Sequence, residues 1–473
     1  MMILGLLIAI GSIVGLSVMT GMKGKKDSGG IGAGVAAGLI MGTLVGGTST
    51  VGTAQLAYNY GMTAWWFTLG GGIGCLILGL IYARPLRAQG KATLVGMIHD
   101  GYGERVGLAA TVLNSLGTFI NILSQMIAAS AVLLVVFPES GNAAVIAAAA
   151  VCMVCYVVFG GTKGAGIVGI LKTVLLSATM LICGVLVLRF TGGIAGFCAD
   201  VNGIRILNTA GEAVSRNLWS LFGRGFWTDF GSCLSLILGV LTTQAYAQAI
   251  LTARSDREAR LGALISGVLI SIIGVFGILV GLYMRSIADP VEAANNSGAL
   301  AKVALTSFIL HYSGIPPFLG GLMLGALFIA SVGTGAGLAL GIATVVNRDL
   351  INGGKLPADR SKYERVNRLI ISCVLAGAAI ITCLLPADTI QDYAFLSMAL
   401  RGCTVFAPLS FLLWSGERVT EKWALLSVVF GCGLALVYGV LKVVGAVSFP
   451  LAAVFPGIAV GLLFMIIGIV SKS

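Results

Sequence analysis

The chain has 473 residues, of which 58% are hydrophobic and 10% are charged, and its formal net charge is +11. A mean hydropathy of +1.01 excludes a soluble globular protein of this length and indicates an all-α polytopic membrane protein. The positive charge does not indicate a nucleic-acid partner, because the sequence has no basic stripe with interleaved aromatic residues.

Long apolar segments occur along the whole chain. A membrane-spanning helix needs about 20 mostly apolar residues. The sequence predicts thirteen such spans, at about 2–21, 32–58, 62–83, 106–136, 142–159, 165–188, 229–250, 261–284, 315–346, 367–385, 390–414, 421–441 and 449–470.

Basic residues collect in alternate connections between these spans. With the N-terminus outside, 20 of the 29 Lys and Arg residues fall in segments predicted inside and seven outside; only Lys172 and Arg401 lie within spans. The first apolar stretch lacks a basic start and a clear cleavage site, so we expect a retained helix and not a cleaved signal peptide. The sequence therefore predicts a multi-pass protein of the plasma (inner) membrane with a cytoplasmic C-terminus.

Two spans carry polar, glycine-rich stretches at mid-membrane. These are GTLVGGTSTVGTAQ at 42–55 and GVLTTQAYAQ at 239–248. Backbone at membrane depth leaves helical geometry only where protein or a water-filled cavity covers it. Without the first and last two spans, two five-helix blocks remain, and each begins with an interrupted span. Paired broken helices predict an inverted-repeat secondary transporter with a site at the midplane; close helix crossing at small residues is the alternative.

Other chemistries find little support. Nearly all of the ten cysteines lie within spans, where they are expected to be small packing residues. Only His99 and His311 offer imidazole ligands, and there is no nucleotide-binding loop to power a pump. We therefore predict no enzyme activity, no organic cofactor and no metal beyond a possible sodium ion.

Arg401 lies in mid-span, too deep to reach an interface easily, and so needs an interior partner. Asp229 and Asp392 lie near the ends of their spans, so we expect the solute to supply the anion as a carboxylate or amino acid. The alternative is that Arg401 bonds to helix-end carbonyls or to Asp392. Further candidate solute contacts, each equally able to bond between helices, are Ser49, Thr50, Gln55 and Gln244.

The seventh span and the loop after it, TTQAYAQAILTARSDREARLG, resemble the sodium:solute symporter family. The matching residues are Gln244, Gln248, Ala253, Ser255, Ala259, Arg260 and Gly262. Weaker matches are VGTAQLAYNYG, YVVFGGTKGAG, Arg348 with Asp349, and FAPLSFLL, so that the resemblance covers about residues 30–415.

The resemblance implies a leucine-transporter-like core of five plus five helices that works by sodium-driven alternating access. The implied units are an accessory helix at 1–28, a core at 29–415 with repeats at 29–190 and 226–415, and two accessory helices at 416–473.

The family's sodium ion lies between the break of the first core helix and the eighth core helix. The resemblance implies ligands from the carbonyls of Gly42, Val45 and Ala330 and from a hydroxyl pair, which reads Gly333 and Thr334 here. One hydroxyl is therefore missing from the expected oxygen ligands.

The fifth core helix also departs from the family pattern. Where the family often has Thr-Asp followed three residues later by Gln, this chain has Gly169 and Lys172. We expect the Lys172 ammonium to occupy or neighbour the sodium position and to exchange a proton there, since desolvation disfavours a charged amine. The alternative is that Lys172 extends to the cytoplasmic interface.

Together these features predict a symporter that takes up a small anionic or zwitterionic solute across the lipid bilayer, coupled to a cation gradient. The cation is sodium by resemblance, or a proton if Lys172 replaces it. A passive channel on the same fold is an alternative. So is a non-transporting sensor, although sensors usually carry appended cytoplasmic domains and the tail here ends at Ser473, directly after the last span.

Overall fold

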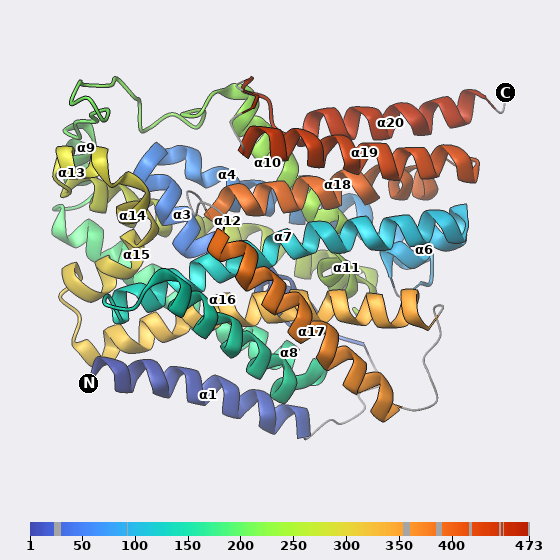
Figure 1. Ribbon diagram of the computed structural model, residues 1–473, viewed down its shortest axis with the longest axis horizontal. Helices are drawn as coiled ribbons and strands as arrows, with labels where there is room; N and C mark the ends of the chain where they lie inside the picture. The colour runs from blue at the N-terminus through green and yellow to red at the C-terminus, as the bar shows by residue number, and fades with distance from the viewer. Residues whose placement is uncertain are drawn as a thin grey trace.

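In a computed structural model, the described part of the chain folds into a bundle of helices (Figure 1). The structure describes residues 1–22, 30–91, 93–352, 360–384, 390–415, 419–443, 446–447 and 449–471; side chains at 13–14, 16–22, 158–168, 349–350, 360 and 443 are not described. Of the basic residues counted for orientation, six lie outside the described residues, namely Lys23, Lys25, Lys26, Lys355, Arg418 and Lys472, and the side chains of Lys163 and Arg360 are not described.

The α-helices run in chain order from the N-terminus. They are α1 (Met2–Met22), α2 (Ala33–Leu44), α3 (Gly47–Tyr60), α4 (Trp65–Ile77), α5 (Ala83–Ala88), α6 (Leu94–Tyr102), α7 (Glu104–Val136), α8 (Asn142–Phe190), α9 (Ile194–Asn202), α10 (Phe226–Thr242), α11 (Gln244–Leu251), α12 (Asp256–Ser286), α13 (Pro290–Asn295), α14 (Ser297–Lys302), α15 (Ala304–Ser307), α16 (Pro317–Val345), α17 (Arg360–Leu384), α18 (Ile390–Trp414), α19 (Glu421–Val443) and α20 (Val454–Val470). A 3-10 turn, η1 (Gly61–Ala64), and three π-helical turns, η2 (Leu78–Tyr82), η3 (Phe308–Tyr312) and η4 (Val346–Ile351), adjoin these helices.

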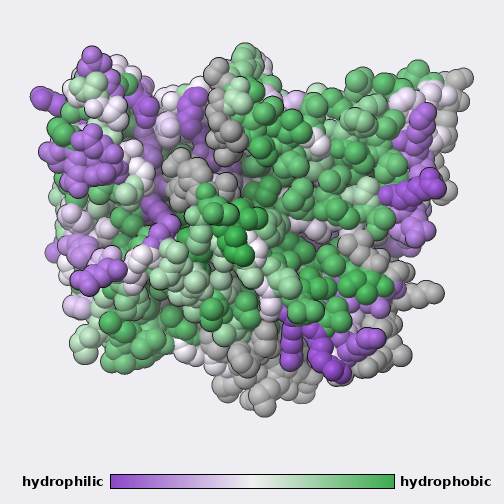
Figure 2. Space-filling view, viewed as in Figure 1, coloured by the Kyte–Doolittle hydropathy of each residue, from purple (hydrophilic) through white to green (hydrophobic). Residues whose placement is uncertain are grey.

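The surface of the bundle suits a bilayer. Figure 2 shows apolar side chains across the middle of the visible face and hydrophilic ones gathered toward its two ends. In the described part of the chain, eight helices are long and apolar enough to cross a membrane, or nine if one bent pair forms a single span. The prediction of an all-helical polytopic protein is therefore confirmed, while the number thirteen and the five-plus-five repeat stay predictions.

The loop expected between the fifth and sixth predicted spans is helical in the structure. The segments 142–159 and 165–188, expected as separate spans, belong to a single helix, α8, of 49 residues. A straight helix of that length would measure about 73 Å, more than twice the hydrocarbon thickness of a bilayer. The glycine-rich stretch between the two segments suggested a loop, but glycine lowers helix stability by only about 1 kcal/mol and does not end a helix by itself.

Both polar, glycine-rich stretches interrupt their helices, as predicted. The helix α2 ends at Leu44, Val45 and Gly46 are extended, and α3 begins at Gly47. The second interruption falls at Thr243, which is extended between α10 and α11, and the two helix axes differ by 47°.

The interrupted helices lie inside the bundle. From Gly47 to Tyr58, every residue of α3 is buried, and α3 packs against α7, α12, α16 and α18. The helices α1, α19 and α20 lie at the periphery, with α1 along α16 and α8, and the last two together beside α18 (Figure 1). The breaks are therefore enclosed by protein, which is the condition for irregular backbone at membrane depth.

Candidate functional site

Side chains form hydrogen bonds with the backbone N–H and carbonyl groups at the first break, which have no partner within a continuous helix. The Gly46 N–H donates to Ser49 Oγ at 3.0 Å, and the Thr50 hydroxyl donates to the Gly46 carbonyl at 2.9 Å. The Gly47 N–H donates to Gln125 Oε1 at 3.0 Å. The hydroxyls of Ser49 and Thr50, two of the candidate solute contacts, bond to the broken backbone, where unsatisfied polar groups would cost several kcal/mol.

Gln125 was not among the sequence-predicted residues. It lies on α7 with an exposed fraction of 3%, and its Nε2 donates to the Thr48 hydroxyl at 2.7 Å. The signal in the sequence was an amide inside the apolar stretch NILSQMIAAS. Its two hydrogen bonds join α7 to the first break.

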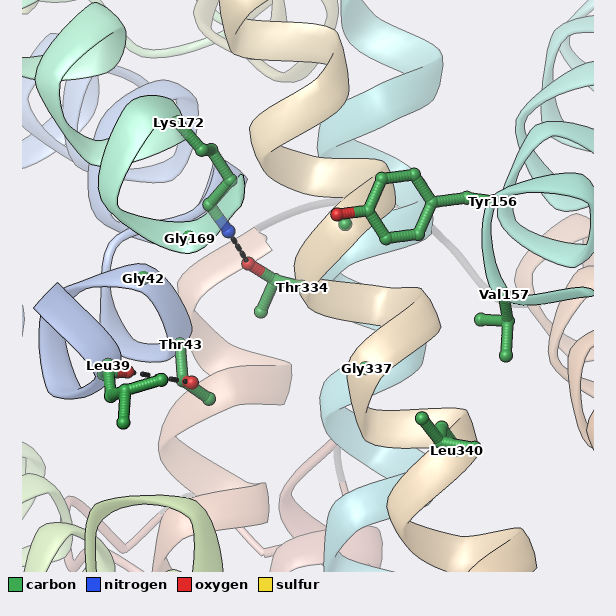
Figure 3. A pocket seen from close by; sticks show the side chains of 11 residues that line it. Leu39, Gly42, Thr43, Tyr156, Val157, Gly169, Lys172, Thr334, Gly337 and Leu340 are labelled. Carbon is green, nitrogen blue, oxygen red and sulfur yellow. Dashed lines mark hydrogen bonds between the residues drawn. The ribbon is translucent and has the colours of Figure 1, made fainter. Parts of the chain in front are cut away.

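Lys172 reaches the helix opposite this break. Its side chain is 3% exposed, and its Nζ donates to Thr334 Oγ1 at 2.7 Å and to the Ala330 carbonyl at 3.2 Å, both on α16 (Figure 3). The same threonine adjoins the break, because a Cβ added to Gly46 would lie 2.8 Å from Thr334 Oγ1. The head group thus lies inside the bundle and not at its surface.

The residues that the resemblance assigns to a sodium ion lie around this ammonium. Ala330 and Thr334 are its two hydrogen-bond acceptors, and a Cβ on Gly333 would be 3.8 Å from Lys172 Cδ. Val45 is buried at the end of α2, where its N–H donates to the Met41 carbonyl at 2.7 Å. Two of the expected oxygen ligands therefore already accept hydrogen bonds from a protein cation.

The helices α2 and α8 touch at two glycines. A Cβ on Gly42 would lie 2.9 Å from Gly169 Cα, closer than real side chains approach. A Cβ on Gly169 would meet nothing nearer than 3.7 Å. The position where the family often has an aspartate thus has room for a side chain, while its neighbour on α2 does not.

A pocket opens beside Lys172. It encloses about 670 Å³ of empty space, part of it open to the surface, and is lined from α2, α8 and α16 by residues that include Leu39, Thr43, Tyr156, Gly337 and Leu340. Figure 3 shows the Tyr156 hydroxyl pointing toward α16 near Thr334. Because Leu39 precedes the break and Leu340 follows Thr334, the pocket extends toward the side where α2 begins and α16 ends.

Arg401 lies at the second break. It is 1% exposed, and its Nη1 donates to the Thr243 hydroxyl at 2.8 Å. Its other contacts are the carbonyl and hydroxyl of Ser397 and the sulfur of Met398. Asp392, considered as its partner, instead bonds to Arg224 Nη1 at 3.0 Å. The polar partners of Arg401 within the described residues are thus neutral.

The five candidate solute contacts do not converge on one point. Gln55 Oε1 accepts from the Ile390 N–H at the first residue of α18, and Gln244 Oε1 accepts from the Leu94 N–H at the start of α6, both at 2.9 Å. Ile390 precedes Arg401 by eleven residues, about 16 Å along a helix. Gln55 and Arg401 thus meet α18 at different depths.

Gln391 is a second buried amide outside the sequence prediction. Its Nε2 donates to Thr53 Oγ1 at 2.9 Å, while its Oε1 has no partner among the described residues. A fully buried acceptor without a partner is uncommon. Gln391 therefore leaves an acceptor oxygen unpaired beside α3 within the described part of the chain.

A group of three or more His, Cys, Asp or Glu side chains able to hold a metal ion is absent from the part of the chain that the structure describes. What the geometry offers instead is two helix breaks, each beside a buried cation. Discontinuous helices enclosing a polar centre define the class of secondary membrane transporters.

Known proteins of similar sequence and structure agree with that class. The monocarboxylic acid transporter of Corynebacterium glutamicum is 24% identical over 391 residues, 80% of this chain and 70% of the relative. The high-affinity choline transporter 1 of Caenorhabditis elegans is 24% identical over 256 residues; the match covers 52% of this chain but only 40% of that protein. A solved Na⁺-coupled sialic acid symporter shares the fold with a TM-score of 0.74 at 15% identity, over 99% of this chain and 96% of that one.

The family model of the Sodium:solute symporter family matches residues 27–431, and the chain belongs to this family. The predicted family is therefore confirmed, and with it the class of multi-pass membrane transporter.

Proposed function

We propose that the protein takes up a small organic carboxylate or amino acid by alternating access, and that the Lys172 ammonium stands where the family's sodium ion would bind. The observation that carries this proposal is the pair of hydrogen bonds from Lys172 Nζ to the Ala330 carbonyl and the Thr334 hydroxyl. An ammonium and a sodium ion both seek oxygen acceptors, and the two cannot share the same pair at hydrogen-bonding distance. Sodium is then not required at this position, and a proton gradient is the first alternative to test.

The chemical class of the solute follows from Arg401. A buried guanidinium with neutral partners carries an uncompensated charge, which a carboxylate neutralises with two parallel hydrogen bonds. The monocarboxylic acid transporter among the relatives supports an anionic solute, whereas the choline transporter is a relative named for a cation. Arg401 favours the anion, because a cationic group beside it would be repelled.

The remaining assignments belong to the same proposal. Gln55, Gln244 and Gln391 border the solute path between the breaks, while Ser49 and Thr50 shape the first break. Gly42, Val45 and Gly333 surround the ammonium site. The core spans 29–415 as two five-helix repeats, flanked by accessory helices within a thirteen-span protein of the plasma membrane with its N-terminus outside.

Uptake by reconstituted vesicles tests the proposal. Labelled monocarboxylates and amino acids are first screened for thermal stabilisation of the purified protein, and the best one is then given to vesicles under a sodium gradient, a pH gradient or neither. We expect saturable accumulation that persists when sodium is replaced by potassium, and its loss in Lys172→Gln.

Three results would count against the proposal. Strict sodium dependence that Lys172→Gln leaves unchanged would remove Lys172 from coupling. Non-saturable equilibration without accumulation would indicate a channel, and solute binding without any flux would indicate a sensor.

A further inference from the structure

The pocket beside Lys172 is separate from the contacts of Arg401 and has a cation at its inner end. We propose that it is a second anion site, which binds the carboxylate of a short-chain monocarboxylate on the Lys172 ammonium. The chemical class rests on the proposed function, since the same solute would meet Arg401 at the second break and this pocket on its way out.

The charge of Lys172 is the first argument. An ammonium has three N–H donors, and two of them are used on the neutral oxygens of Ala330 and Thr334. The ion pairs of the described residues join other cations to acids: Arg87 to Asp256, Lys91 to Asp100, and Arg224 to Asp229 and Asp392. A cation that is 3% exposed and lacks a carboxylate partner among the described residues is costly, and an anion bound beside it removes much of that cost.

The walls of the pocket are the second argument. Leu39, Val157 and Leu340 supply apolar surface, and the hydroxyls of Thr43 and Tyr156 supply a few polar points. The Thr43 hydroxyl donates its proton to the Leu39 carbonyl at 3.1 Å, so only its lone pairs remain for other hydrogen bonds. A mostly apolar cavity with one charged group at its end is the usual form of a site for a small amphipathic molecule.

The position of the pocket is the third argument. Arg401 bonds to Thr243 between α10 and α11, whereas Lys172 bonds to α16 and its pocket extends toward the start of α2. Under the predicted orientation that side faces the cytoplasm. A solute released from the second break is therefore held once more before it leaves.

One glycine of α16 allows the pocket to be filled without changing the ammonium, and a second provides a matched control. A Cβ on Gly337, which lines the pocket, meets no described atom within 4 Å, and the same holds for Gly341, one turn further along and outside the pocket lining. Gly337→Leu should occupy the space of the solute tail, while Gly341→Leu adds the same side chain to the same helix elsewhere.

Butyrate binding to the purified full-length protein tests the site. We expect two butyrate molecules per wild-type chain and one in Arg401→Gln. In that background, Lys172→Met should weaken butyrate binding at least about tenfold, since hydrogen bonds to charged groups contribute that much. Gly337→Leu should also weaken it at least about tenfold, because the added side chain takes the space of the butyrate tail, and Gly341→Leu should not. Thermal unfolding of each variant checks that it is folded. If Lys172→Met does not fold, Gly337→Leu still tests the pocket, because this variant keeps the charge of Lys172.

Equal butyrate affinities in the Gly337→Leu and Gly341→Leu variants would overturn the inference, as would the absence of binding when Arg401 is replaced. Failure of the proposed function is recorded separately by the uptake assay. Butyrate binding in the pocket without gradient-driven uptake would leave the site standing and remove the symport proposal.

Discussion

Arg401 donates a hydrogen bond of 2.8 Å to the hydroxyl of Thr243, the residue at which α10 gives way to α11. The buried cation of α18 is thus tied to the second break. The first break is built similarly, because Lys172 donates to Thr334, whose hydroxyl adjoins Gly46. In both places a threonine hydroxyl lies between a buried cation and interrupted backbone.

Replacing Arg401 should strongly reduce the uptake of a carboxylate solute. Arg401→Gln removes the charge and should lower uptake efficiency by roughly 10- to 100-fold or more, the effect of losing one charge-assisted hydrogen bond or two. Arg401→Lys keeps the charge but not the forked geometry and should recover only part of the activity. Initial uptake rates measured against solute concentration check this, and wild-type kinetics in Arg401→Gln would remove the residue from the solute site.

Restoring the family pattern at Gly169 and Lys172 should restore sodium dependence. A Cβ on Gly169 would meet nothing nearer than 3.7 Å, so the backbone accommodates an aspartate there. The double variant Gly169→Asp with Lys172→Gln frees the Ala330 carbonyl and the Thr334 hydroxyl and supplies a carboxylate for a hard cation. We expect sodium-stimulated uptake in the double variant and little uptake in Lys172→Gln alone.

The control for this experiment is Gly42→Ala. Its Cβ would lie 2.9 Å from Gly169 Cα, so it should reduce uptake by pushing α2 from α8. If the double variant remains indifferent to sodium while retaining its fold, the assignment of this site by resemblance is wrong.

Asp229 should matter more for stability than Asp392, although both bond to Arg224. The Asp229 side chain is 0% exposed and accepts from Arg224 Nε at 2.8 Å, whereas the Asp392 side chain is 52% exposed. Asp229→Asn should lower the free energy of unfolding by about 3–5 kcal/mol, because it removes the buried carboxylate and leaves Arg224 with only its exposed acidic partner, Asp392. Asp392→Asn should cost less than about 1 kcal/mol, as exposed pairs do. Denaturant unfolding in detergent compares them, and equal losses would contradict this ranking.

Arg87 should stabilise the end of α11. Its Nη1 donates to the carbonyls of Ile250 and Ala253 at 3.0 and 2.7 Å, and its Nε donates to Asp256 at 2.7 Å. Arg87→Ala removes the side-chain donor from these carbonyls and should accelerate hydrogen exchange in α11 about tenfold or more. Asp256→Asn, which removes only the exposed partner, is the matched control and should change exchange little. Unchanged exchange in Arg87→Ala would show that α11 does not depend on this contact.

The sequence determined the class of protein and the places where its helices break. Hydropathy over about 20 residues decides whether a segment prefers lipid, and this is a local property. The interruptions at Val45 and Thr243 were also predictable, because glycine next to threonine and glutamine marks backbone that needs other partners. The family was recognisable mainly from one segment, the seventh predicted span and the loop after it, since residues 242–262 carry the most specific pattern.

Only the tertiary structure decided what the polar residues do. Lys172 finds Thr334 across 162 residues of chain, and Arg401 finds Thr243 across 158, and periodicity contains no information about such pairs. Ser49 and Thr50 have the composition of solute contacts, yet their hydroxyls bond the break one turn away. The physical reason is that a buried polar group takes whichever partner packing brings within about 3 Å, and packing is settled by the whole bundle.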